Sequence, residues 1–300
     1  MNLRIGTRGS QLALWQANEV ANRLSENGWR PEIVTIKTTG DKRLDVSLAS
    51  IGGKGLFIKE LEDALRRGEI DLAVHSLKDV PSMIPDDFTL AGFLDRADPR
   101  DAWVQLDGRS LAEMHAGAVV GTSAPRRRAQ FRALFPQLKL EEIRGNVDTR
   151  INKLRAGLYD GAVLAAAGLT RLGRASEITS YFAIDEMTPA AGQGIVAIET
   201  LCTNRNAIDA AQSINYEPSA RAARCGRGVL QKFGEVLDCY SAVAVHATIA
   251  DETTTIRAFF GELEGSRSVR VMKCGGSDDA VVAAVHDALV GEGALELVQT

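Results

Sequence analysis

The sequence lacks the signatures of several common protein classes. Its four cysteines, Cys202, Cys225, Cys239 and Cys274, form no C-x-x-C pair, so we expect free thiols and no zinc or other metal site. Neither H-E-x-x-H nor G-x-x-x-x-G-K-[ST] occurs, which removes the usual signatures of zinc proteases and nucleotide triphosphatases. No stretch approaches the roughly 20 apolar residues that a membrane-spanning helix needs.

An excess of positive charge is also lacking, because 35 Lys and Arg residues are outnumbered by 39 Asp and Glu residues. General binding to nucleic acid or to a membrane surface usually requires a basic face, so neither partner is expected. The N-terminus MNLRIGTRGS has no apolar run after its first charge, and we expect a cytoplasmic protein. Recognition of an anion would therefore depend on a local cluster of cations.

Strand-like and helix-like segments alternate early in the 300-residue chain. The apolar segment 3–7 leads through a glycine turn to Ser10, a typical helix N-cap. Strand-like 31–38, helix-like 56–68 and strand-like 71–76 follow, and this alternation predicts a parallel sheet covered by helices.

Two internal repeats suggest that this unit occurs twice. LRRGEIDLAV at 65–74 matches LRAGLYDGAV at 154–163 in Leu, Arg, Gly, Asp, Ala and Val at equal spacing, and 5–7 resembles 120–122. Because both repeats occur in the same order, we infer two similar α/β domains with a cleft between them. From about residue 213 the pattern indicates a smaller α+β domain.

Cationic and polar residues gather where strand-like segments end, which is the edge where α/β sheets bind ligands. The planar fork of arginine pairs with carboxylate or phosphate, so several arginines would suit a ligand with many carboxylates. The alternative is that they are solvated helix ends. The residues concerned are Thr7, Arg8, Ser10, Lys54, Thr122, Ser123, Arg126, Arg127, Arg144 and Arg150.

The segment AVHSLKDVP at 73–81 places Lys78 and Asp79 after an apolar run that implies a buried strand. The two could form a surface ion pair of little consequence. Alternatively, we expect a buried carboxylate there, which could stabilise a positive charge on a substrate and, in its protonated form, pass a proton to a leaving amine. His75 fits a hydrogen-bonded structural residue as well as it fits a catalyst.

Eight segments resemble, in order, the signature segments of the porphobilinogen deaminases, also called hydroxymethylbilane synthases, and they cover about residues 3–200. The segments are RIGTRGSQLALWQA, IGGKGLFIKELEDAL, DLAVHSLKDVP, RADPRDAWV, VGTSAPRRRAQ, IRGNVDTRINKL, AAAGLTRLG and AAGQGIVAIE.

The resemblance implies an α/β fold with three domains. Two are similar lobes of the type II periplasmic-binding-protein kind, formed by 1–96 with 194–212 and by 97–193. The third, 213–300, is a small α+β domain that carries the cysteine to which a cofactor is attached.

The resemblance also implies a transferase, expected to be a monomer. Four porphobilinogen molecules lose ammonia in turn through enzyme-bound azafulvene, and hydrolysis then releases the linear tetrapyrrole hydroxymethylbilane to a downstream tetrapyrrole enzyme. The chain grows on a dipyrromethane cofactor that is made from the same substrate and is bonded through a thioether to a cysteine.

Residue roles follow from the matching motif positions. Asp79 and Lys78 match the catalytic pair, and Arg8, Arg150 and Arg171 match the residues that bind substrate. The implied cofactor-binding residues are Ser10, Lys54, Lys78, Asp79, Thr122, Ser123, Arg126, Arg127 and Arg144.

Cys239 is the implied attachment site, because CYSAVAVHA aligns with the strand that follows it in the family. Asp238 before this cysteine and the absence of a proline soon after it depart from the family pattern, as does Ala124-Pro125 before the arginine pair. Two alternatives therefore stay open: a divergent paralogue that releases a shorter pyrrole oligomer, and a non-catalytic two-lobed protein that binds anions.

Overall fold

The computed structural model describes residues 2–37, 58–238 and 240–298. It divides into two compact units, Met1–Ala97 with Gly194–Arg224 and Asp98–Gln193 with Cys225–Thr300. No helix within the described ranges is long and apolar enough to cross a membrane.

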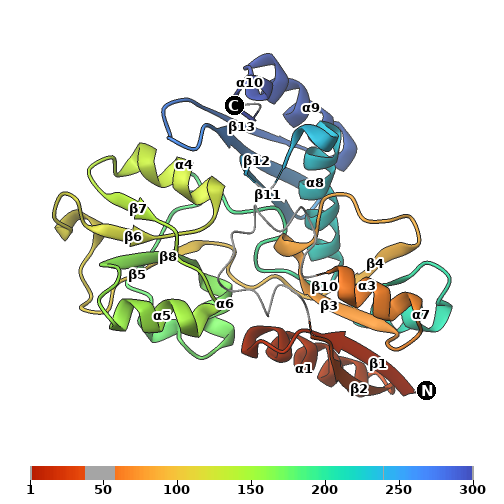
Figure 1. The fold of residues 1–300 in the computed structure, drawn as a ribbon. Helices are drawn as coiled ribbons and strands as arrows, with labels where there is room; N and C mark the ends of the chain where they lie inside the picture. Colours follow the sequence, from red (N-terminus) through yellow and green to blue (C-terminus); the bar gives the residue numbers. More distant parts are fainter. Residues whose placement is uncertain (1, 38–57, 239, 299–300) are drawn as a thin grey trace. The chain divides into compact units, whose positions relative to one another are not determined.

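A five-stranded sheet in the order β2-β1-β3-β10-β4 forms the first lobe (Figure 1). Strand β1 (Asn2–Thr7) runs parallel to β2 (Arg30–Thr35) and β3 (Leu72–Ser76). Strand β10 (Val196–Leu201) lies antiparallel to both β3 and β4 (Phe88–Phe93).

Helices cover both faces of this first sheet. Apolar residues of α1 (Gln11–Glu26) and α7 (Arg205–Ser213) share one core cluster with β1, β3 and β10. The short helix α3 (Lys59–Arg66) packs on the opposite face against Ala73 and Phe88. Ser10 caps α1, since its side chain accepts a hydrogen bond from the Ala13 N–H, as the sequence predicted.

The second lobe repeats this arrangement in a sheet with the order β7-β6-β8-β5-β9. Strand β6 (Val119–Gly121) is parallel to β7 (Lys139–Glu141) and β8 (Gly161–Ala165), whereas β5 (Asp101–Val104) is antiparallel to β8 and β9 (Ser180–Tyr181). Helices α5 (Val147–Arg155) and α6 (Ala166–Arg171) contribute to one core cluster, and α4 (Pro125–Leu134) contributes to another through Phe131.

The two sheets have equivalent strands at equivalent places, which confirms the similarity of the two α/β units that the internal repeats predicted. The repeat 65–74 leads into β3 and the repeat 154–163 leads into β8, the third strand of each sheet. In both repeats the glycine after the helix, Gly68 or Gly157, has a positive φ of 65° or 70°.

The predicted parallel sheets are mixed instead. The fourth strand of each lobe follows a crossing from the other lobe, and it enters at the edge where the parallel strands end: Val196 pairs with Ser76, and Asp101 pairs with Ala165. A strand that starts at this edge must run back across the sheet, so it is antiparallel to its neighbour.

The last part of the chain is a small α+β structure, as predicted. Its antiparallel sheet has the order β11 (Ala242–Ala250), β12 (Thr253–Gly261) and β13 (Ser268–Gly275). Helices α9 (Asp278–Gly291) and α10 (Ala294–Val298) pack on it. The end of α8 (Glu217–Phe233) joins them through Phe233, whose ring lies 4.7 Å from that of Phe260. The predicted α/β fold class, with two similar lobes and a small α+β part, is therefore confirmed.

Gly161 provides a test of the second-lobe core. A Cβ atom at this position would lie 2.0 Å from a ring carbon of the fully buried Trp103. We expect Gly161→Ala to lower the free energy of unfolding by about 1–3 kcal/mol, because the core must move to admit the methyl group. In Gly226→Ala, the matched control in α8, the new Cβ meets only Ala191 at 3.6 Å. The control should be neutral or stabilising in chemical denaturation, and equal losses in both variants would contradict this packing.

Candidate functional site

Strand β3 ends in the turn that carries the predicted catalytic pair. Leu77, Lys78 and Asp79 form one turn of 3-10 helix, in which the buried Leu77 donates its N–H to the carbonyl oxygen of Ile195 at 3.0 Å. Lys78 and Asp79 are both exposed. The expectation that the Asp79 carboxylate is buried was therefore wrong: the apolar run ends at Leu77, and the turn directs the next two residues outward.

A cavity of about 70 Å³ lies beside this turn in the first lobe. It brings together three of the predicted site residues, Arg8, Ser10 and Asp79, which follow β1 or β3. Gln16 and Ser76 also line it, and Gln16 Nε2 donates to Ser76 Oγ at 2.7 Å. The cavity thus places one carboxylate beside a guanidinium group and two hydroxyl groups at the carboxyl end of the parallel strands, where α/β proteins bind ligands.

In the second lobe, Thr122 and Ser123 follow β6 as predicted, and Thr122 is fully buried. Arg126 and Arg127 lie in the first turn of α4, where Pro125 occupies the first helical position. Both arginines are buried, although most arginines are exposed.

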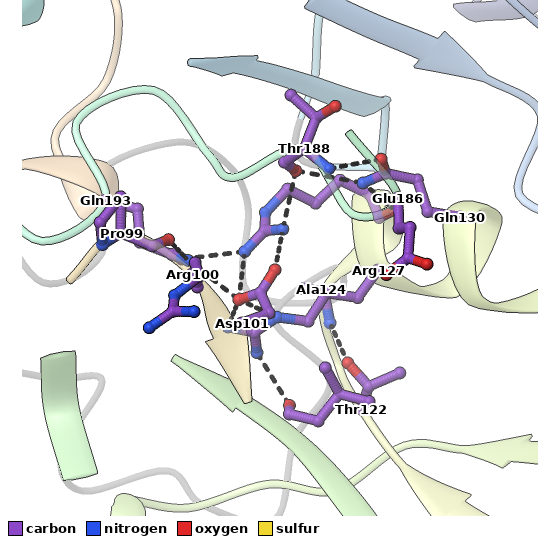
Figure 2. A network of polar contacts seen from close by, with 12 residues as sticks. Pro99, Arg100, Asp101, Thr122, Ala124, Arg127, Gln130, Glu186, Thr188 and Gln193 are labelled. Atoms are coloured by element: carbon purple, nitrogen blue, oxygen red, sulfur yellow. Dashed lines mark hydrogen bonds and ion pairs between the residues drawn. The ribbon is translucent and has the colours of Figure 1, made fainter. Parts of the chain in front are cut away.

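The partner of both arginines is Asp101, the first residue of β5 (Figure 2). Arg126 Nη1 and Nη2 reach the two Asp101 oxygens at 2.5 and 3.1 Å, and Arg127 Nε and Nη2 reach Oδ1 at 3.0 and 2.8 Å. Arg126 also donates to the carbonyl oxygen of Thr188 and to Gln193 Oε1. Gln193 in turn donates to Asp101. Through Thr188 and Gln193, the segment that follows β9 is thereby hydrogen-bonded to β5 and α4.

Burial alone would raise the pKa of Asp101, but the charges of Arg126 and Arg127 outweigh burial and hold that pKa well below its usual range. The carboxylate is therefore ionised at neutral pH, and it neutralises only one of two buried guanidinium charges. Arg126 and Arg127, which the sequence predicted as ligand-binding residues, thus use much of their hydrogen-bonding capacity within the lobe. Asp101 was not predicted, since it lies 25 residues from Arg126 in sequence.

The remaining predicted arginines lie in or beside two helices of the same lobe. Arg144 precedes α5 and pairs with Glu142 at 2.6 Å, whereas Arg150, within α5, donates Nε–H to the carbonyl oxygen of Gly145 at 2.8 Å. Asn146 caps α5 by accepting from the Thr149 N–H. Arg171 is the last residue of α6 and is half-buried.

Two predicted residues, Lys54 and Cys239, lie outside the described residues. Of the other cysteines, Cys225 is buried, and Cys202 and Cys274 are exposed free thiols. No group of three or more potential metal ligands occurs in the part of the chain that the structure describes.

These features define a two-lobed α/β protein with cationic and hydroxyl-bearing side chains at the carboxyl ends of its parallel strands. A family model described as "Porphobilinogen deaminase, dipyromethane cofactor binding domain" matches residues 3–209. The chain belongs to the porphobilinogen deaminase family.

Curated relatives agree with this assignment over most of their length. The porphobilinogen deaminase of Geobacter metallireducens is 43% identical over 98% of this chain and 93% of its own. That of Geobacter sulfurreducens is 44% identical over 89% of this chain and 84% of its own. That of Albidiferax ferrireducens is 47% identical over 88% of this chain and 83% of its own.

The Asp101 network gives a testable stability difference. Asp101→Asn leaves two buried guanidinium groups without their counter-ion, so we expect it to lower the free energy of unfolding by about 3–5 kcal/mol. Asp98→Asn, which breaks the more exposed Asp98–Arg100 pair, is the control and should cost about 1 kcal/mol or less.

The pH dependence of that difference has a definite sign. Because the folded-state pKa is depressed, the stabilisation by Asp101 is present above the unfolded-state value of about 3.9 and is lost as pH falls through the folded-state value. Denaturant titrations should therefore show the largest gap between wild type and Asp101→Asn at neutral pH. A gap that widens in acid would contradict the ion network.

Proposed function

We propose that this chain is a porphobilinogen deaminase, a transferase that joins four porphobilinogen molecules into the linear tetrapyrrole hydroxymethylbilane with release of ammonia. Membership of the family supports the reaction class. The observation that carries the proposal is the position of Asp79, which shares a cavity with Arg8 and Ser10 at the end of β3.

Binding of the substrate rests on its two carboxylates, an acetate and a propionate, on each pyrrole ring. Arginine forks suit such groups because they form paired, charge-assisted hydrogen bonds. We assign this role to Arg8 in the first lobe and to Arg150 and Arg171 in the second. An acidic protein can thus bind an acidic substrate through cations placed only at the strand ends.

Asp79 is assigned the catalytic role. Its ionised carboxylate accepts a hydrogen bond from the pyrrole N–H and stabilises the positive charge that develops on the ring as ammonia leaves. In its protonated form the same group can supply a proton to the departing amine. Lys78, exposed beside it, pairs with a carboxylate of the ligand. Exposure of both side chains is what access by a substrate requires.

A dipyrromethane cofactor fits the first-lobe donors, since Arg8, Ser10 and Lys78 offer cationic and hydroxyl groups near Asp79. In the second lobe, Arg126 fits less well as a direct ligand, because its Nη1 and Nη2 groups already donate four hydrogen bonds, to Asp101, Thr188 and Gln193. When bound, the cofactor supplies the pyrrole carbon on which the product grows. The residues assigned to hold it are Ser10, Lys54, Lys78, Asp79, Thr122, Ser123, Arg126, Arg127 and Arg144, with a thioether to Cys239.

We further propose three domains, 1–96 with 194–212, 97–193 and 213–300, in a cytoplasmic monomer that passes its product to a downstream tetrapyrrole enzyme. The boundary between the first two domains is supported by the two points where the chain leaves and re-enters the first unit. There the Ala97 N–H donates to the Gly194 carbonyl oxygen.

The attachment site is tested by intact-protein mass. We expect the purified protein to carry two additional pyrrole units and to give a red colour with Ehrlich's reagent, and Cys239→Ala to lose both. Cys202→Ala, which changes an exposed cysteine, should keep them. A wild-type protein without the adduct would instead indicate the non-catalytic anion-binding alternative, and chromatography of the released product distinguishes a shorter oligomer.

The role of Asp79 is tested by turnover. Asp79→Ala should lower kcat by about 10²-fold or more, because the charge that stabilises the ring cation is gone. Asp86→Asn, at an exposed aspartate that we assign to no site, should leave porphobilinogen consumption unchanged. Full turnover by Asp79→Ala would remove the proposed mechanism.

A further inference from the structure

Two ionisable side chains are buried behind the turn that carries Lys78 and Asp79. His75 belongs to β3 and Glu199 belongs to β10, and His75 Nε2 lies 2.9 Å from Glu199 Oε2. Their side chains are only 5% and 0% exposed. Neither has a role in the function proposed above.

Burial of these two side chains costs free energy, because polar groups lose their hydration inside the lobe. Glu199 Oε1 is buried and has no hydrogen-bond partner among the described residues. Replacing both partners of a buried hydrogen bond by apolar groups of the same shape can be nearly neutral or stabilising. Stability of the first lobe therefore gives no reason for a histidine and a glutamate at these positions.

The position of the pair in the sheet supplies a reason. His75 is the next-to-last residue of β3, opposite Ala197 of β10, and the last pair in the register joins Ser76 to Val196. Beyond that pair, the next hydrogen bond between the two chain segments runs from the Leu77 N–H to the Ile195 carbonyl oxygen. The His75–Glu199 contact is thus a side-chain connection between β3 and β10 that begins one residue before Ser76, where β3 ends, and reaches back to the residue opposite Ala73.

Other charged groups surround the pair. Glu62 of α3 has a pKa raised first by burial and then by the charge of Glu199, while Arg66 and His75 act in the opposite direction and Asp87 adds to the rise. His75 also lines the cavity that contains Arg8 and Asp79. The charge of Glu199 thus acts on a carboxylate of α3, and His75 is in addition a wall of the cavity assigned to the substrate.

We propose that His75 and Glu199 are positioning residues for Asp79, which hold the carboxyl end of β3 against β10 so that the turn keeps its carboxylate in the cavity. This inference rests on the proposed function and deepens it. The hydrogen bond between the two side chains provides the connection, because it links His75, the next-to-last residue of β3, to Glu199 of β10, which stands opposite Ala73 in the register.

The first test is the double variant His75→Leu with Glu199→Met, which replaces the pair by apolar side chains. We expect a similar melting temperature, a kcat lower by about tenfold or more, and a KM within about twofold of wild type. Hydrogen exchange supplies a readout independent of turnover: the Leu77 amide should exchange faster than in wild type. Asp71→Asn is the matched control, since it breaks the Arg4–Asp71 pair at the opposite end of β3 and should change neither quantity.

Single substitutions that keep a hydrogen bond test the same idea if the double variant does not fold. His75→Gln can still donate to Glu199, and Glu199→Gln can still accept from His75, so each should keep kcat within about threefold of wild type and a slowly exchanging Leu77 amide. A tenfold loss in these folded single variants would overturn the proposal, as would normal kcat and normal Leu77 exchange in the folded double variant. A wild-type protein that does not consume porphobilinogen would refute the proposed function instead, and Leu77 exchange would still decide the positioning role.

Discussion

The candidate site residues of each lobe depend on one constraint, which is that the carboxyl ends of the parallel strands within a lobe meet at a single edge of its sheet. In the first lobe, this edge carries Arg8 after β1 and Asp79 after β3. In the second lobe, it carries Thr122 after β6, and Asp101 begins the antiparallel strand that starts there. The same topology that orders the strands therefore gathers polar side chains that are far apart in the sequence.

The two lobes use this edge differently. In the first lobe, Asp79 and Lys78 remain exposed beside a cavity, which leaves their charges available to a ligand. In the second lobe, Arg126 and Arg127 are buried against Asp101, and the network extends to Thr188 and Gln193. The first lobe thus has an exposed carboxylate beside a cavity, whereas in the second lobe buried charges hold the segment through which the chain returns.

Local signals in the sequence predicted the elements that depend on neighbours in the chain. Ser10 caps its helix, and the repeats around Gly68 and Gly157 occupy equivalent places in two equivalent sheets. Contacts between distant segments could not be predicted in this way. Glu199 lies 124 residues from His75, and its only signal is a carboxylate within the apolar strand VAIETL. The exposure of Asp79 was also missed, because an apolar run does not show where the chain turns out of the sheet.

The central claim is that the Asp79 carboxylate contacts the pyrrole ring on which the positive charge develops. A crystal structure of the protein after exposure to porphobilinogen tests this most directly. The account predicts a carboxylate oxygen about 3 Å from a pyrrole nitrogen of the bound ligand. A ligand bound elsewhere, with Asp79 in bulk solvent and remote from the cysteine that holds the cofactor, would contradict it.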